Sequence, residues 1–308
     1  MIEDLSEWKA YLLSGGLIPE KHEELDWSGR GQHAEYEKNE ESEIPIKVKD
    51  LIGHSATALV HLVKCRRTLL ARKMISCNVR LRKEDAISEV EHPQKLRHSH
   101  IIRVAGTYVI GKKFAILLYP AADWNLNEFL DHKEWPTGKE ILRTLACLAS
   151  AVAFLHANAI KHMDIKPHNI LIRQLSVPSY SPFDPSSRSY NVYLADFGIA
   201  KSYASAANAE TDSLTACTRM YVAPEVVEQE RRGLSADIFS LGCVFAETLS
   251  YVAGPIQTMR YTGFNVRRLS EISGFSYQAN LEMVKSLFRG ASFIPVFRDY
   301  HIASDEAF

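Results

Sequence analysis

Short apolar runs separated by polar turns dominate the first third of the chain and predict β-strands. Residues 69–75, L-L-A-R-K-M-I, form an apolar run broken by one basic pair, and we expect a buried strand that carries Lys73 near its end. Residues 114–119, F-A-I-L-L-Y, form a second run that stops before Pro120 and predict another buried strand. The N-terminal part of the chain is therefore expected to be rich in strands.

The apolar period becomes helical in the middle of the chain. Five aliphatic residues after Gly138 recur at alternating four- and three-residue spacing: Ile141, Leu145, Leu148, Val152 and Leu155. This spacing predicts an amphipathic helix with one wide apolar face. Because the stretch is short for a bilayer and carries Arg143, we predict that it does not span a membrane.

Two segments lack such a pattern. Residues 1–44 have no sustained apolar period, and 35–43 form a mostly acidic, polar run. We interpret 1–44 as a partly helical, poorly packed and mainly solvated extension, with a regulatory role as the alternative. Residues 174–190 are rich in serine and proline and predict a loop inserted between two strands.

Composition and charge exclude several classes of function. The 308 residues are 46% hydrophobic, with a net charge of −1 and a pI of about 6.9. This balance argues against bulk attraction to nucleic acid or to an anionic membrane. The five cysteines show no metal-ligand spacing, and an odd number of scattered thiols suits a reducing compartment. The first residues do not resemble a signal peptide, so we expect a cytosolic or nuclear protein.

Two polar motifs supply the candidate chemistry. Residues 160–173 read I-K-H-M-D-I-K-P-H-N-I-L-I-R, and residues 196–198 read D-F-G. Transfer of a phosphoryl group from ATP needs a carboxylate to orient the attacking hydroxyl, a cation beside the moving group and oxygen ligands for Mg²⁺. Four side chains offer this set: Asp164, Lys166, Asn169 and Asp196. Taken singly, such residues are also common in turns and on solvated surfaces.

The pattern H-x-D-x-K-x-x-N followed by D-F-G resembles the eukaryotic protein kinase superfamily. The resemblance implies that Asp164 orients the substrate hydroxyl or accepts its proton, and that Lys166 stabilises the γ-phosphoryl group. It also implies that Asn169 and Asp196 ligate Mg²⁺. Lys73 matches the family lysine that contacts the α- and β-phosphates of ATP.

The partner of Lys73 is also implied by the resemblance. L-R-H-S-H-I at 96–101 looks like a stretch of the family pattern, and counting back from it selects Glu89, in a helix expected over 82–96. An ordinary surface ion pair between Lys73 and Glu89 is the alternative.

Residues 51–60 occupy the place of the family's glycine-rich loop. Only Gly53 of its three glycines remains, and Ser55 and Ala58 take the other two positions. Because each added Cβ restricts the approach of the backbone to the phosphates, we expect a usable but less intimate phosphate cover.

The adenine site is implied in the same way. Val60 and Ala71 would pack on the adenine ring, and the backbone of Tyr119 and Ala121 would form hydrogen bonds with its edge. Leu171 is assigned to the same nucleotide site.

Residues 217–225, C-T-R-M-Y-V-A-P-E, are similar to the segment that closes the kinase activation segment. Thr218 and Lys166 favour a serine/threonine kinase over a tyrosine kinase. A further helix is expected from Ser235, a candidate N-cap, and Asp237 near its start would anchor the backbone of the catalytic loop.

Three departures from the family pattern stand out. Met163 replaces an arginine that pairs with a phosphorylated activation loop, and methionine has no charge for that purpose. Pro93 follows Glu89 by one turn and predicts that the helix ends or kinks there. After residue 264 we find one amphipathic stretch, 279–288, and no family arginine for Glu225.

These observations predict an α+β, two-lobed protein-kinase-like fold, with a small N-lobe that has an antiparallel sheet and one helix, and a larger, mainly helical C-lobe. The expected domain spans 45–290, with the N-lobe over about 45–120, the C-lobe over about 124–290 and a divergent tail at 291–308. The expected function is ATP- and Mg²⁺-dependent phosphorylation of serine or threonine in protein substrates. The alternative is a pseudokinase-like, nucleotide-binding scaffold or regulatory module. The sequence does not indicate an oligomeric state.

Overall fold

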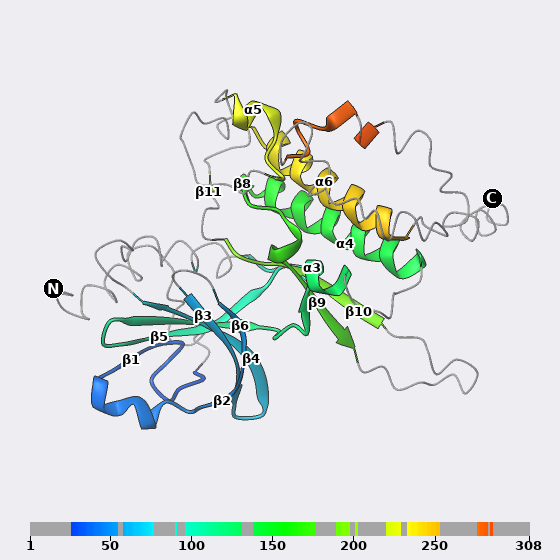
Figure 1. Cartoon of the computed structure of the whole chain (residues 1–308). Helices are drawn as coiled ribbons and strands as arrows, with labels where there is room; N and C mark the ends of the chain where they lie inside the picture. The colour runs from blue at the N-terminus through cyan, green and yellow to red at the C-terminus, as the bar shows by residue number, and fades with distance from the viewer. Residues whose placement is uncertain are drawn as a thin grey trace, which may run out of the picture. The chain divides into compact units, whose positions relative to one another are not determined.

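The computed structural model describes residues 26–54, 58–76, 90, 96–130, 138–175, 189–197, 201–202, 220–228, 233–252, 276–282 and 284–285. The chain divides into two compact units. The N-terminal unit comprises residues 1–123 and 195–200, and the C-terminal unit comprises 124–194 and 201–308. The described part of the first unit is mainly strands, and that of the second contains the long helices (Figure 1).

The N-terminal unit is built on a six-stranded sheet with the order β1-β5-β6-β4-β3-β2. Its strands are β1 (His33–Tyr36), β2 (Ile46–His54), β3 (Ala58–Cys65), β4 (Thr68–Ser76), β5 (Arg103–Ile110) and β6 (Lys113–Tyr119). β4 and β6 contain the two apolar runs, so both strand predictions are confirmed. Leu69 is exposed, however, and only part of β4 is buried. Of the helix expected over 82–96, the structure describes Val90, which is helical and buried, and Leu96.

The sheet is mixed, whereas the prediction was an antiparallel sheet. β1 pairs in parallel with β5, with His33 opposite Thr107. The other neighbouring strands pair antiparallel. Residues 33–36 belong to the segment that was predicted to be poorly packed. The short 3-10 helix η1 (Lys38–Glu43) follows β1, so most of the described part of this segment has regular structure.

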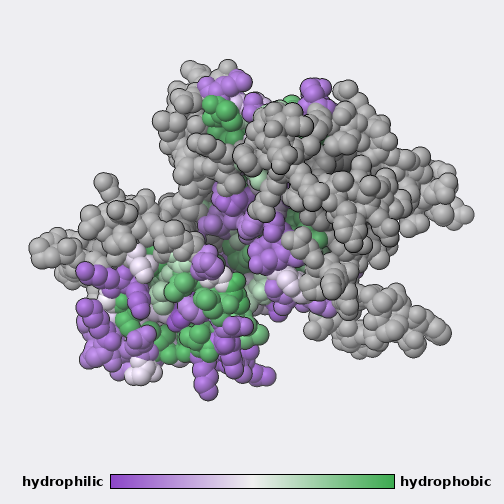
Figure 2. All heavy atoms as spheres, in the orientation of Figure 1, coloured by the Kyte–Doolittle hydropathy of each residue, from purple (hydrophilic) through white to green (hydrophobic). Residues whose placement is uncertain are grey.

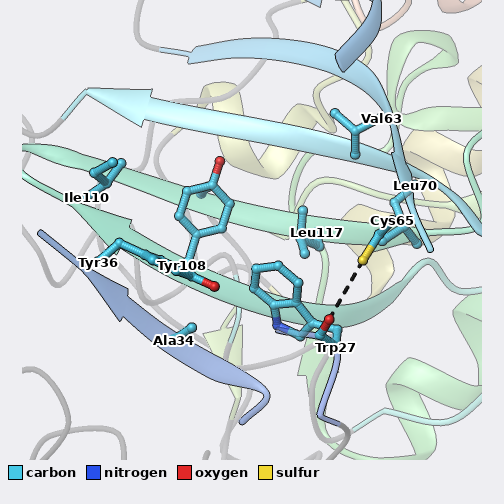
Figure 3. Close-up of a cluster of buried hydrophobic side chains, with 10 residues drawn as sticks. Trp27, Ala34, Tyr36, Val63, Cys65, Leu70, Tyr108, Ile110 and Leu117 are labelled. Carbon is cyan, nitrogen blue, oxygen red and sulfur yellow. Dashed lines mark hydrogen bonds between the residues drawn. The ribbon is translucent and has the colours of Figure 1, made fainter. Parts of the chain in front are cut away.

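Residues 26–44 help to form a second apolar core against the sheet (Figure 3). Because side chains alternate between the two faces of a strand, Leu117 points to the opposite face from Ile116. One cluster contains Ala58, Ile75, Val90, Val104, Phe114 and Ile116. The other contains Trp27, Ala34, Tyr36, Val63, Cys65, Leu70, Tyr108, Ile110, Ala115 and Leu117. The prediction of a solvated segment was therefore wrong for these residues, because their few apolar side chains reach a sheet that is distant in sequence.

A glycine in β5 lets Trp27 reach the sheet. A Cβ atom at Gly106 would lie 2.3 Å from Trp27 Nε1 and 2.7 Å from the carbonyl oxygen of Gln32. The Trp27 indole N–H donates a hydrogen bond of 2.8 Å to that same carbonyl. Position 106 must therefore lack a side chain for the tryptophan to pack as it does.

Several apolar side chains of the sheet remain exposed, and Figure 2 shows apolar surface in this unit bordered by polar side chains. The exposed large apolar residues of the sheet are Val48, Leu51, Ile52, Leu59 and Leu69. They lie on β2, β3 and β4, at the edge of the sheet opposite β1. The second core thus leaves part of the sheet uncovered by the described residues.

The C-terminal unit contains helices and two small sheets. Its helices are α3 (Leu126–Leu130), α4 (Gly138–Ala157), α5 (Pro224–Val227) and α6 (Ser235–Val252), with the 3-10 helix η2 (Pro167–Asn169). β7 (Trp124–Asn125), β9 (Ile170–Leu175) and β10 (Ser189–Leu194) form one sheet, in the order β10-β9-β7. β8 (Ile160–Lys161) and β11 (Lys201–Ser202) form the other.

α4 confirms the predicted amphipathic helix, because all five predicted apolar residues are buried. The argument from length was wrong, since the helix has 20 residues and its span Glu140–Ala157 is long and apolar enough to cross a bilayer. The apolar face of α4 is explained by its packing, because the helix contacts β10 and α6. α4 therefore packs as a core helix of this unit.

The inserted loop is shorter than predicted. β9 and β10 pair antiparallel, with Gln174 opposite Tyr190 and Leu175 opposite Ser189. Both ends of the 174–190 stretch therefore belong to strands. The pairing of β9 with β10 extends into the ends of this stretch despite its loop-forming composition. Residues 176–188 lie outside the described residues.

Candidate active site

Three of the predicted catalytic side chains meet in the C-terminal unit. They lie on the loop between β8 and β9, which contains η2. Lys166 Nζ is 2.6 Å from Asp164 Oδ2, and Asn169 Nδ2 donates to the same oxygen at 2.9 Å. Asn169 Nδ2 also donates to the Asp164 carbonyl oxygen at 2.9 Å. The Asp164 carboxylate is therefore held by a cation and an amide, which orient it and offset its charge.

Asp237 of α6 fixes the start of this loop, as predicted. Its carboxylate accepts hydrogen bonds of 2.8 Å from the backbone N–H groups of His162 and Met163. Its Oδ2 also lies 3.0 Å from His156 Nε2 on α4. Met163 has a φ of 68°, a left-handed conformation that costs a non-glycine residue about 1–2 kcal/mol. The Asp237 hydrogen bonds offset that cost at the residue just before Asp164.

The pKa of Asp237 follows from these contacts. Burial alone would raise it, but the hydrogen bonds from His156 and from the two backbone amides, with the nearby His162, together lower it below the usual value. The folded protein therefore favours the charged carboxylate. This contribution to stability is complete above the unfolded pKa of about 3.9 and is lost as the pH falls through the lower folded pKa.

We expect Asp237→Asn to lower the free energy of unfolding by about 2–3 kcal/mol at pH 7, the typical loss for hydrogen bonds to a buried charge. The deficit should begin to shrink below about pH 4, where the unfolded wild-type carboxylate becomes protonated, and it should be lost only as the pH falls through the lower folded pKa. Urea unfolding across pH 3–7 measures both effects. Asp50→Asn, on the exposed strand β2, is the matched control. A deficit that stays constant down to pH 3 would contradict the assigned charge.

Two further predicted residues meet in the N-terminal unit. Lys73 Nζ on β4 is 3.2 Å from Asp196 Oδ1. The Lys73 side chain is 18% exposed and that of Asp196 is 42% exposed, so the pair is open to solvent on the aspartate side. Asp196 has a φ of 67°, and Phe197 after it is buried. The buried phenylalanine helps to hold the turn that presents Asp196.

Four predicted nucleotide residues of the N-terminal unit lie on its sheet: Gly53, Val60, Ala71 and Tyr119. Gly53 is opposite Val60, and Ala71 is opposite Leu118. Ala71 is buried, and β6 ends at Tyr119, two residues before Ala121. A Cβ atom at Gly53 would meet Val60 at an ordinary 3.7 Å, so local packing alone does not require glycine there. Leu171, the predicted nucleotide residue of the C-terminal unit, lies on β9, opposite Tyr193.

Several predictions lie outside the described residues. They concern Ser55, Glu89, Pro93 and Thr218. Glu225 is described, and Ser235 Oγ donates to its Oε1 at 3.2 Å. Ser235 is the first residue of α6, and its hydroxyl contacts this neighbouring carboxylate, so the predicted cap is replaced by this contact. The sequence lacks the family arginine for Glu225 and left open that another residue contacts it, and in the structure Ser235 is such a residue.

The donor chemistry fits Mg²⁺ and ATP. Because the Asn169 amide nitrogen donates to Asp164, the amide oxygen is the atom left for a hard cation. Asp196 offers a carboxylate, and Lys73 offers a cation suited to phosphate oxygens. In the described part of the chain, no group of three or more His, Cys, Asp or Glu side chains could hold a metal by itself. A Mg²⁺ ion bound by Asn169 or Asp196 would take its other ligands from phosphates and water, as is usual for this ion.

Comparison with known proteins gives the wider context. A family model for the protein kinase domain matches residues 46–285. The chain belongs to the protein kinase family. The match begins after the 26–44 segment, so the second core of this kinase uses residues that precede the matched region.

The relatives of this kinase include serine/threonine kinases. It is 28% identical over 202 residues to calcium/calmodulin-dependent protein kinase type 1 of Macrobrachium nipponense, which covers 64% of this chain and 54% of the relative. It is 30% identical over 167 residues to a calcium/calmodulin-dependent protein kinase of Metarhizium anisopliae, which covers 54% and 40%. Serine/threonine-protein kinase 33 of Bos taurus is 29% identical over 158 residues, covering 51% and 31%. The kinase thus spans about half or less of the length of these curated relatives.

Proposed function

We propose that this kinase is an active enzyme that transfers the γ-phosphoryl group of ATP, with Mg²⁺, to serine or threonine hydroxyls of protein substrates. The observation that carries the proposal is the Asp164 carboxylate, held by both Lys166 and Asn169. A binding scaffold has no need to orient this carboxylate, whose partial burial is costly without partners.

Each residue has a chemical task in this proposal. Asp164 orients the substrate hydroxyl and accepts its proton, while Lys166 stabilises charge on the transferred group. Lys73 would hold the α- and β-phosphates, and Asn169 and Asp196 would ligate Mg²⁺. When bound, ATP supplies the phosphoryl group, and Mg²⁺ would offset the negative charge that develops on the phosphate oxygens. The ion pair between Lys73 and Asp196 keeps both side chains oriented beforehand.

The test is transfer of labelled γ-phosphate from ATP to a generic basic protein, run with the wild type and with Lys73→Met. We expect transfer by the wild type and a loss in kcat/KM of about 10- to 100-fold in the variant, which corresponds to one lost hydrogen bond between charged groups. Lys64→Met is the matched control, because Lys64 is an exposed lysine on β3.

Two results would overturn the proposal. Equal transfer by the wild type and Lys73→Met would show that the measured transfer does not depend on the proposed ATP site. No transfer by the wild type, combined with a rise in its melting temperature on addition of ATP, would favour the nucleotide-binding scaffold.

A further inference from the structure

Two tyrosine side chains from distant segments of the C-terminal unit gather around one carboxylate, that of Glu247. Tyr221 OH donates to Glu247 Oε2 of α6 at 2.8 Å, and Tyr277 OH lies 3.5 Å from the same oxygen. The Tyr221 and Tyr277 rings are 5.6 Å apart. We call these three residues the tyrosine clamp. It joins the loop before α5 to α6 and to the short helical segment around Tyr277.

Tyr277 also contacts the loop through its backbone. Its N–H donates a hydrogen bond of 3.0 Å to the carbonyl oxygen of Met220. The Tyr277 side chain is only 2% exposed. Burial, and then the Glu247 carboxylate, raise the pKa of Tyr277, so its hydroxyl stays protonated and can donate. The Tyr277 hydroxyl is therefore the donor, and the Glu247 carboxylate is the acceptor, of this hydrogen bond.

The segment that carries Tyr277 is stabilised locally. Ser276 Oγ accepts a hydrogen bond from the Ala279 N–H, and Asn280 Nδ2 donates to the Ser276 carbonyl oxygen. Asn280 and Val284 are buried. The segment therefore has its own internal caps and a buried side, and it can act as a support for the loop.

Two further described contacts of this loop are hydrogen bonds from serine hydroxyls. Ser240 Oγ donates to the Tyr221 carbonyl oxygen at 2.8 Å. Glu225 takes a hydrogen bond from Ser235 in an exposed position. Such exposed contacts contribute little. The clamp adds a hydrogen bond from Tyr221 to Glu247 and a ring contact with the buried Tyr277 to these supports.

This loop borders the proposed base. A cavity of about 30 Å³ is lined by residues of both the catalytic loop and the loop before α5, including Asp164, Tyr221, Val222 and Ala223. Whatever fixes the position of Tyr221 to Ala223 therefore shapes the surface beside Asp164, where a substrate hydroxyl must be presented.

We infer that Tyr277 and Glu247 are positioning residues, which hold the loop from Met220 to Ala223 in the conformation that receives the protein substrate. The inference rests on the proposed kinase function. The clamp lies within the C-terminal unit, whereas all the residues assigned to ATP except Leu171 belong to the N-terminal unit. Its loss should therefore weaken use of the protein substrate and leave use of ATP unchanged.

Steady-state kinetics with both substrates varied test this. We expect Tyr277→Leu to raise KM for the protein substrate about tenfold, as small displacements near a reacting group do, with KM for ATP within about twofold of wild type. Glu247→Gln should raise the same KM by about threefold, since the amide keeps an acceptor but loses the charge. Glu282→Gln, the same chemical change on the exposed side of the Tyr277 segment, should leave both KM values unchanged.

Hydrogen exchange provides a readout that does not depend on activity. Peptides that cover 220–228 should exchange about tenfold faster in Tyr277→Leu than in Glu282→Gln, while α4 peptides stay unchanged. Unchanged exchange at 220–228, or equal rises in both KM values, would overturn the inference. If the wild type transfers no phosphate, the proposed function fails. Hydrogen exchange at 220–228 then tests by itself whether the clamp holds the loop. If Tyr277→Leu does not fold, Glu247→Gln and Tyr277→Phe, which keeps the ring, decide it by the same two measurements.

Discussion

Replacing Asp164 by asparagine is expected to lower kcat for phosphoryl transfer by about 10²- to 10⁴-fold, the usual contribution of a positioned general base. The amide has the same shape and keeps an oxygen that can accept from Lys166 and Asn169. It cannot accept a proton from the substrate hydroxyl. The fold should therefore survive while the chemical step is lost.

Steady-state kinetics and thermal melting together check this result. KM for ATP and the melting temperature should stay close to wild type, because Asp164 is not assigned to nucleotide binding. Asp50→Asn provides the matched control, since Asp50 lies on the exposed strand β2 of the other unit. If Asp164→Asn retained more than a tenth of wild-type kcat, as an order-of-magnitude threshold, its assignment as the base would be wrong.

Replacing Trp27 by alanine is expected to lower the free energy of unfolding by about 3–5 kcal/mol, the range for removing a large buried aromatic side chain. Trp27 is 8% exposed, packs with Tyr108 at a ring distance of 5.8 Å and donates a hydrogen bond to Gln32. The cavity left behind borders Gly106, which has no side chain to fill it. Urea unfolding, followed by far-UV circular dichroism, measures the loss.

Val48→Ala is the control for this prediction. Val48 is 52% exposed on β2 of the same sheet, and its loss should change stability by less than about 0.5 kcal/mol. The same reasoning extends to a chain that begins at Ile46, where the family match starts. Such a chain lacks Trp27, Ala34 and Tyr36, and we expect it to be less stable than the Trp27→Ala variant. If the shortened chain were as stable as the full chain, the second core would have no energetic role.

Regular patterns made much of the described fold predictable. The period of α4 required a buried stripe, and Leu148 and Leu155 are indeed fully buried. The aliphatic run of β6 likewise predicted its buried strand. The contact between Asp237 and the catalytic loop was predictable from the family pattern, because both partners lie in recognisable motifs.

Other contacts carried no local signal. Trp27, Ala34 and Tyr36 are buried against a sheet whose strands follow much later in the sequence, and the packing of Trp27 depends on Gly106 in one of those strands. Tyr277 and Glu247 meet Tyr221 across separations of 56 and 26 residues. The shorter 174–190 loop has the same cause, since pairing between β9 and β10 extended both strands into a stretch of loop-forming composition.

The sequence by itself determined the candidate catalytic residues of this protein and its main helices and strands. A carboxylate, a lysine and an amide at short spacing can meet within one loop, and an apolar period determines which face of a helix is buried. The tertiary structure alone decided that residues 26–44 complete a core, that Ser235 contacts Glu225 and that a tyrosine clamp holds the loop beside Asp164. The physical reason is that these contacts depend on which segments folding brings together, and the free energy of burial depends on the partner a side chain meets, not on its neighbours along the chain.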